Sequence, residues 1–214
     1  MTAFLSVCVI LFALFESLHA QGNATTAAPT RPPWPKPNCG NAQLTNSVRN
    51  LILNLHNNYR GSVARGQTEV SAGWGIAPPA TIMYRMKYDC NAESYAQQAV
   101  STCRKTPLPE GTLGGHKQNL HILNTVYTTP VGAVQNVINT LINTFVEIRN
   151  MLKTMAWWNN RRVGCAVKQC SGYFVTSCMY SPGGNYVNQY VYRVGAVCSD
   201  CPAGQCDGQA LCRW

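Results

Sequence analysis

The sequence predicts an α+β domain, either of the simple α+β class or as a three-layer α-β-α arrangement, followed by a small Cys-rich extension. Apolar residues recur at helical spacing in three stretches between residues 45 and 145, and they alternate with polar residues after residue 162. Helices that precede strands are typical of these layered folds. Ten cysteines between residues 39 and 212 predict covalent bracing of the domain and its extension.

The N-terminus has the pattern of an export signal. It is apolar from Met1 to Phe15, Glu16 is its first charge, and it ends in a small residue at Ala20. A bilayer span needs about 20 apolar residues, so we predict a secretory signal over residues 1–20 rather than an anchor. No later stretch is long and apolar enough for stable membrane insertion. The sequence therefore predicts a secreted, extracellular protein.

Residues 21–38 form a Pro- and Thr-rich leader. Five prolines fix the backbone dihedral φ and withhold amide donors, so the segment is expected to be extended and semi-rigid. Asn23 begins the only N-glycosylation sequon, Asn-Ala-Thr, in the chain.

Ordered structure is expected from Cys39, in a domain over residues 39–197. Val48, Leu55 and Tyr59 lie on one helical stripe, with Thr45 as its N-cap. His56 lies beside this stripe, and we interpret it as a hydrogen-bonded structural histidine.

Two further helices follow. Asp89 is the predicted N-cap of one, and Thr129-Pro130 supplies a cap and a first-turn proline for the other. Gly and Pro predict irregular loops over residues 61–88 and 106–119.

After residue 162 the spacing of apolar residues changes from the helical period to the alternation that is typical of strands. Residues 163–167 and 173–180 are predicted strands joined by a turn at residues 170–172, and a third strand is expected near residues 190–194.

The cysteine count after the predicted signal is even. An even number in an exported chain implies disulfides, here five, although the pairing stays open. The spacing in the tail, residues 198–214, also permits a four-thiolate zinc site, but an oxidising compartment favours disulfides. The ten residues are Cys39, Cys90, Cys103, Cys165, Cys170, Cys178, Cys198, Cys201, Cys206 and Cys212.

The formal net charge of +9 permits several partners. A basic exported protein can meet heparin-like glycans, acidic membrane surfaces or acidic faces of proteins, or the charge serves solubility alone. The bases are scattered rather than gathered in a stripe, so we expect no nucleic-acid partner. The sequence has no G-x-S-x-G elbow and no phosphate-binding P-loop.

Four motifs together resemble the CAP superfamily. They are Leu-His-Asn-Asn-Tyr-Arg at 55–60, Met-Ala-Trp at 155–157 with Gly-Cys-Ala-Val at 164–167, Cys-Met-Tyr-Ser-Pro-Gly-Gly-Asn at 178–185, and the Cys pattern of the tail. The resemblance is strongest to the Ancylostoma-secreted or venom-allergen-like group of parasitic nematodes, including hookworm platelet inhibitors. It implies a three-layer α-β-α CAP sandwich and a tail like the family's hinge.

The resemblance also implies a central cavity, which in this family usually holds two His and two Glu. Here the matching positions are Pro107, Gln118, Asn143 and Met151. Neutral amides and a thioether bind zinc poorly, so we expect no catalytic residue, metal or cofactor. One alternative draws His116 and His121 in from the neighbouring loop, with Glu147.

The resemblance implies action through a host cell-surface protein, with platelet or leukocyte integrins as the sharpest expectation. The sequence has no Arg-Gly-Asp, so another surface would serve, with Trp74, Arg161 and Arg162 as candidate contacts. The alternative function is sterol or fatty-acid transport. Its candidate residues are Leu141, Ile142, Phe145, Tyr180 and Tyr186.

Overall fold

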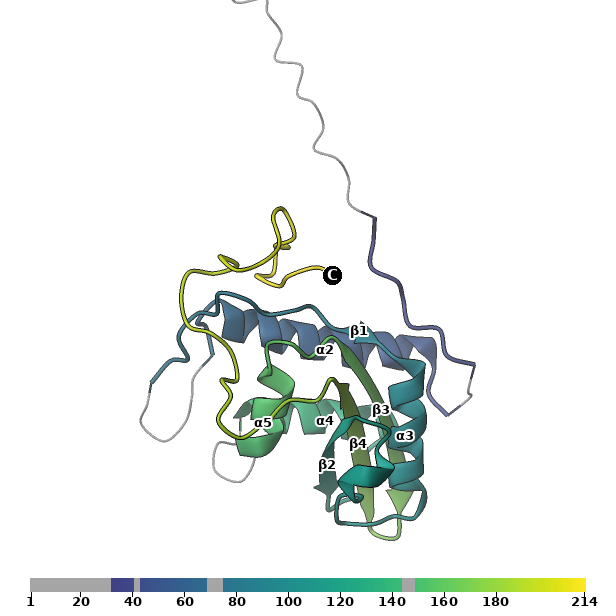
Figure 1. Cartoon of the computed structure of the whole chain (residues 1–214). Helices are drawn as coiled ribbons and strands as arrows, with labels where there is room; N and C mark the ends of the chain where they lie inside the picture. The colour runs from purple at the N-terminus through teal and green to yellow at the C-terminus, as the bar shows by residue number, and fades with distance from the viewer. Residues whose placement is uncertain (1–31, 41–42, 69–74, 144–148) are drawn as a thin grey trace, which may run out of the picture. The chain divides into compact units, whose positions relative to one another are not determined.

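The computed structural model describes residues 32–40, 43–68, 75–143 and 149–214 (Figure 1). Side chains of residues 139–152 are not described. Residues Pro35–Trp214 form one compact unit. The predicted signal, residues 1–20, and the glycosylation candidate Asn23 lie outside the described residues, as does Trp74.

The described part of the chain has three layers. The central sheet has the strand order β1 (Lys87–Tyr88), β3 (Arg162–Cys170), β4 (Tyr173–Ser181), β2 (Lys117–Leu123). The β1–β3 pair is parallel and the other two pairs are antiparallel. Figure 1 shows α3 (Cys90–Ser101) on one side of the sheet and the helices α4 (Pro130–Asn143) and α5 (Arg149–Ala156) on the other. The expected α-β-α sandwich is confirmed.

Each face of the sheet has its own core. Side chains of α2 (Asn46–Ala64), α4 and α5 pack on one face against Val163, Cys165 and Tyr180. Alanines of α3 pack on the other face against Ala166, Val175 and Met179. The alanines let α3 lie very close to the sheet: a Cβ at Gly164 would come within 2.2 Å of the Glu93 amide nitrogen.

The three predicted helix starts are confirmed. Thr45 Oγ1 accepts a hydrogen bond from the amide of Val48, and the Asp89 carboxylate accepts one from Ala92. Pro130 is the first residue of α4, and Thr129 Oγ1 accepts from the Gly132 amide. These local hydrogen bonds satisfy donors that a helix leaves unpaired at its first turn.

One strand prediction and one loop prediction need correction. The strand expected near residues 190–194 does not form, since only an isolated bridge between Ala80 and Val194 lies there and Tyr190 is 78% exposed. The loop predicted over 106–119 ends earlier than expected, because β2 begins at Lys117 and pairs with β4. Its first residues, Lys117-Gln118-Asn119, have low strand propensity, and tertiary pairing overrides that preference.

Helix and loop boundaries also differ from the expectation. The helix α2 continues to Ala64, into the predicted 61–88 loop, and the same loop ends in the short strand β1. The sequence analysis predicted neither the helix α5 nor a short 3₁₀ helix, η1 (Glu110–Thr112).

All ten cysteines within the described residues are paired. Three disulfides brace the sandwich and two close the tail, so the zinc alternative for the tail is wrong. The pairs are Cys39–Cys90, Cys103–Cys170, Cys165–Cys178, Cys198–Cys206 and Cys201–Cys212.

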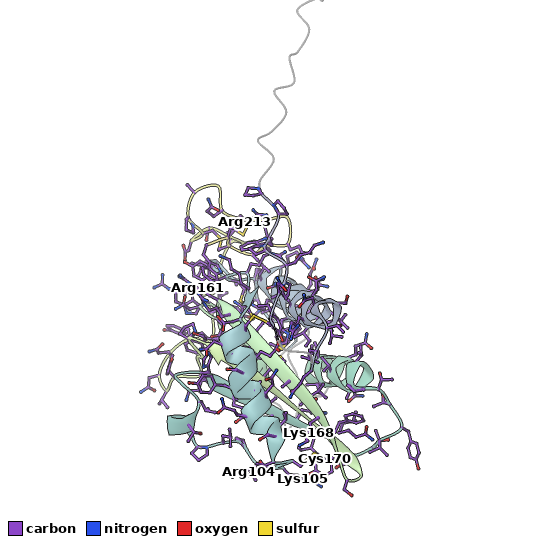
Figure 2. All side chains as sticks on the ribbon, turned by 90° about the vertical axis from the view of Figure 1, so that its right-hand side faces the viewer. Arg104, Lys105, Arg161, Lys168, Cys170 and Arg213 are labelled. Carbon is purple, nitrogen blue, oxygen red and sulfur yellow. A yellow bond between two sulfur atoms is a disulfide. The ribbon has the colours of Figure 1, made fainter. Side chains whose placement is uncertain are left out.

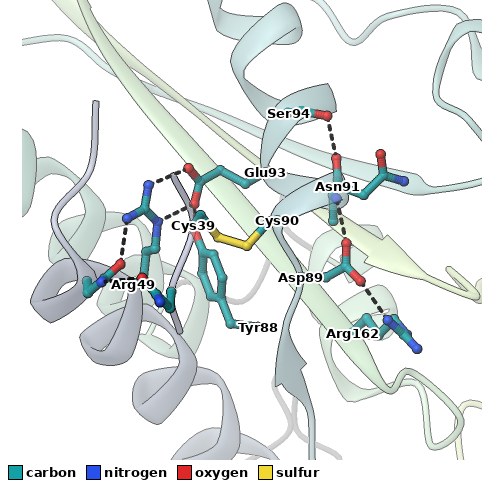
Figure 3. The surroundings of a disulfide bond; sticks show 12 residues. Cys39, Arg49, Tyr88, Asp89, Cys90, Asn91, Glu93, Ser94 and Arg162 are labelled. Carbon is teal, nitrogen blue, oxygen red and sulfur yellow. Dashed lines mark hydrogen bonds and ion pairs between the residues drawn. A yellow bond between two sulfur atoms is a disulfide. The ribbon is translucent and has the colours of Figure 1, made fainter. Parts of the chain in front are cut away.

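A buried ion pair joins α2 to α3 beside the first of these disulfides (Figure 3). The Arg49 Nε and a second guanidinium nitrogen donate to the two Glu93 carboxylate oxygens at 2.7 and 2.8 Å, and both side chains are at most 2% exposed. The Tyr88 hydroxyl also donates to Glu93 at 2.7 Å. The hydrogen bonds with Glu93 raise the pKa of Arg49 above its usual value. Arg49 therefore stays charged inside the protein.

We predict that Arg49→Met lowers the free energy of unfolding by about 3–5 kcal/mol, because Glu93 would remain buried without its cation. Arg193→Ala is the control, since the Arg193–Asp200 pair is exposed and 3.9 Å long; it should cost less than about 1 kcal/mol. Guanidinium denaturation with the disulfides intact measures both. Equal stability losses in the two variants would contradict the prediction.

Candidate functional site

The guanidinium of Arg60 organises the segment that carries the candidate site. Arg60 is fully buried on α2, and its nitrogens donate to the carbonyl oxygens of Tyr84, Met155, Trp157, Trp158 and Asn160 at 2.7–3.2 Å. Burial lowers the pKa of Arg60 to about 9. One side chain thereby fixes the end of α5 and the turn that follows it.

His56, one turn earlier on the same helix, is confirmed as a structural histidine. Its ring is fully buried, with Nδ1 2.8 Å from the Ile52 carbonyl and Nε2 2.9 Å from the Tyr180 hydroxyl. Burial, opposed by the Ile52 hydrogen bond and reinforced by the charge of Arg60, lowers the pKa of His56 to about 4. The ring is therefore neutral at physiological pH and faces the core rather than a ligand.

A cleft of about 670 Å³ lies beside α5 and the edge strand β2, and we call it the Trp157 cleft. The Trp157 ring meets the Tyr186 ring edge to face at a centroid distance of 5.6 Å. The residues that line the Trp157 cleft are Pro107, Glu110, Lys117, Gln118, Asn119, Leu120, Lys153, Thr154, Trp157, Asn185, Tyr186, Val187, Asn188, Gln189 and Val191.

The 183–189 segment is held over the cleft by local contacts. The Asn160 side chain donates to the carbonyls of Thr154 and Gly183 at 2.6 and 2.8 Å and accepts from the Gly183 amide at 2.8 Å. A Cβ at Gly184 would lie 2.3 Å from Trp157, and its φ of +88° favours glycine. The close approach explains why Gly-Gly precedes Asn185.

Two of the predicted cavity positions, Pro107 and Gln118, line this cleft. The Gln118 side chain is already engaged: its Oε1 accepts from the Leu108 amide at 2.9 Å and its Nε2 donates to Ser177 Oγ at 3.0 Å. It fixes the loop that carries Pro107. The side chains of the other two positions, Asn143 and Met151, are outside the described residues.

The described lining does not suit a divalent metal. It contains no histidine or cysteine, and Glu110, its one carboxylate, pairs with Lys117. A zinc site needs three or four nitrogen, sulfur or carboxylate ligands. Neither His116 nor His121 belongs to the described lining. His116 Nδ1 lies 2.8 Å from the Leu113 carbonyl oxygen. Burial lowers the pKa of His121 below its usual value. The proposed third partner, Glu147, is outside the described residues.

The other predicted residues fall in different places. Arg161 and Arg162 lie beside the C-terminal tail, whereas Tyr180 is fully buried in the core and Tyr186 is 43% exposed at the cleft. The side chains of Leu141, Ile142 and Phe145 are not described. Among the described helices, none is long and apolar enough to cross a bilayer.

Sequence reasoning missed an aromatic partner for the two arginines. The Trp214 ring centroid lies 5.6 Å from the Arg161 guanidinium carbon, 5.7 Å from that of Arg162 and 3.8 Å from Lys87 Nζ. The Arg161 guanidinium also stacks 4.1 Å from the Tyr84 ring. We call Lys87, Arg161, Arg162 and Trp214 the Arg161 surface.

Comparison with known proteins finds one family model, and several proteins and structures, that are similar to this chain. Residues 53–180 match the family model "CAP: Cysteine-rich secretory protein family". The Ancylostoma secreted protein of Ancylostoma caninum is 31% identical over 183 residues, which cover 77% of this chain and 43% of that relative. The chain thus spans less than half the length of this relative.

Two further relatives are similar over most of their own length. Hookworm platelet inhibitor 1 of Ancylostoma caninum is 25% identical over 166 residues, covering 74% of this chain and 75% of that protein. A crystal structure of NaASP2 with Zn²⁺ superimposes with a TM-score of 0.75 at 26% identity, covering 82% of this chain and all of that one.

The buried state of His56 predicts a specific pH dependence of stability. The pKa of the His56 ring is 6.5 in the unfolded chain and about 4 in the folded protein. Stability from the neutral ring is therefore complete above pH 6.5 and is lost as the pH falls towards 4, by about 3 kcal/mol in total. Denaturant titrations should show a weaker loss on acidification for His56→Gln than for the wild type. Parallel pH profiles would contradict burial of a neutral ring.

Proposed function

The chain belongs to the cysteine-rich secretory protein (CAP) family, and on that premise we propose that it is a secreted, non-catalytic protein that antagonises a host cell-surface receptor. Platelet or leukocyte integrins are the proposed receptor class. The similar proteins are described by name as a secreted protein and a platelet inhibitor. Five disulfides support an extracellular location, because such bonds persist in oxidising compartments.

The observation that carries the non-catalytic part of the proposal is the state of Gln118. Its amide carries no charge, and both ends of it bind the protein's own groups. A general acid or base must exchange a proton near neutral pH, and an amide does not. The described lining of the Trp157 cleft offers no imidazole to replace it.

The Arg161 surface is the proposed receptor contact. Stacking on Tyr84 restrains the Arg161 side chain before any partner arrives, so less conformational entropy is lost on binding. Arg and Trp are also the residue types that most often anchor protein interfaces. Since the chain has no Arg-Gly-Asp, recognition would use this surface or block the receptor sterically.

Lipid transport is the second candidate, favoured by one observation. Tyr186 and Val187 line the Trp157 cleft and are 43% and 87% exposed. Exposed apolar groups beside a cleft are a feature of ligand sites. A sterol or fatty acid would contact these two residues, with Leu141, Ile142 and Phe145 as further candidates.

We predict that the purified secreted protein inhibits platelet aggregation or leukocyte adhesion at micromolar dose. The variant Arg161→Ala/Trp214→Ala should raise the half-inhibitory concentration by roughly tenfold or more, because it removes the restrained anchor and its aromatic neighbour. Aggregometry and a static adhesion assay measure the two effects.

Lys36→Ala/Arg193→Ala serves as the matched control, since both bases are exposed and lie outside the Arg161 surface. It should inhibit like the wild type. Inactivity of the wild type in both assays, with a lipid recovered from the purified protein by extraction and mass analysis, would favour the second candidate instead.

A further inference from the structure

A second basic surface lies at the far end of the sheet from the Arg161 surface. Arg104, Lys105 and Lys168 gather there around the Cys103–Cys170 disulfide, and all three are exposed (Figure 2). We call these three residues the hairpin-end surface. Lys168 lies more than 60 residues from Arg104 and Lys105 in the sequence, so the sequence analysis could not predict that the three gather.

Local contacts hold the three cations on a fixed frame. The disulfide joins the end of α3 to the β3–β4 hairpin, and the Tyr173 hydroxyl donates to the Cys103 carbonyl. Lys105 Nζ lies 4.3 Å above the Tyr173 ring. Lys168 Nζ donates to the Ser101 carbonyl at 2.6 Å, where it offsets the negative end of the α3 dipole.

No described carboxylate neutralises this surface. Each of the five described acidic residues forms an ion pair with a base elsewhere, so the charge of the hairpin-end surface stays available to an external anion. The pairs are Arg49–Glu93, Arg85–Asp207, Lys117–Glu110, Arg162–Asp89 and Arg193–Asp200.

The neighbours of the three cations decide which anion fits. Thr102, Thr106, Gln169 and Ser171 are exposed beside them and can hydrogen-bond hydroxyl and sulfate oxygens. None of the described exposed large apolar residues lies in the segments 101–106 or 168–173. A surface that docks on lipid combines basic with apolar side chains, and this one does not.

We propose that the hairpin-end surface binds a linear sulfated polysaccharide of the heparin type. The Arg104 guanidinium offers a planar fork to a sulfate group, and the two lysines act as point charges towards neighbouring sulfates. Arg104 has one described side-chain contact, 3.4 Å to Thr106 Oγ1, so it turns to a ligand at little structural cost. The polar rim contacts the sugar hydroxyls.

Such binding would hold the protein near a cell surface while the Arg161 surface stays free. The two proposals are independent, since they use separate residues. Loss of polysaccharide binding would leave receptor antagonism standing, and loss of antagonism would leave polysaccharide binding standing.

The test uses the full secreted chain and heparin. We expect the wild type to stay on a heparin column at about 0.15 M NaCl, and its log affinity to fall linearly with log salt. Arg104→Ala/Lys105→Ala should lose roughly tenfold or more in affinity and reduce that salt slope by about two. Lys168 is left in place because it also binds the end of α3.

Lys36→Ala/Arg193→Ala removes the same number of charges elsewhere and should bind like the wild type. Circular dichroism and a free-thiol assay establish that the variants are folded and oxidised. Equal losses in the two double variants would overturn the proposal, because binding would then follow net charge alone. It would also be overturned if desulfated heparin bound as tightly, or if only phosphatidylserine vesicles bound.

Discussion

The buried guanidinium of Arg60 is the interaction on which the arrangement of the site depends. It bonds to five backbone carbonyls from two segments, near Tyr84 and over residues 155–160. These segments carry Trp157 in the cleft and Arg161 on the outer surface. A lysine has three donors on one atom and could not satisfy so many acceptors in a planar array. A single side chain of α2 thereby sets both the cleft and one proposed contact surface.

The disulfides extend this constraint outwards. Cys39–Cys90 lies beside the buried Arg49–Glu93 pair, Cys165–Cys178 crosses the centre of the sheet, and Cys103–Cys170 closes its far end. The two tail disulfides hold the segment that ends in Trp214. Covalent bracing of this kind presents surface residues in fixed positions, and fixed positions reduce the entropy lost when a partner binds. The rigid frame suits a binding protein whose cleft holds the engaged amide of Gln118 and no histidine among its described lining residues.

Much of the fold could be predicted from local patterns. Thr45, Asp89 and Pro130 mark helix starts because capping acts over three residues, and Gly172 marks the hairpin turn with a φ of +83°. The edge strand β2 could not be predicted this way, because its pairing with β4 is distant in sequence. The same holds for the disulfide pairing and for the proximity of Arg161 to the Trp214 ring. Gln118 was identified through the family resemblance, but its hydrogen bonds to Leu108 and Ser177 could be seen only in the folded structure.

Whether the Trp157 cleft binds a metal ion distinguishes a binding protein from a metal-dependent enzyme. Crystals of the secreted protein soaked in zinc, with anomalous diffraction measured at the zinc edge, examine it directly. We predict no ordered zinc among Pro107, Gln118 and Lys153, because proline, an engaged amide and a cation offer no ligand set. A tetrahedral zinc ion in the cleft, held by histidines and carboxylates from neighbouring segments, would contradict a non-catalytic function.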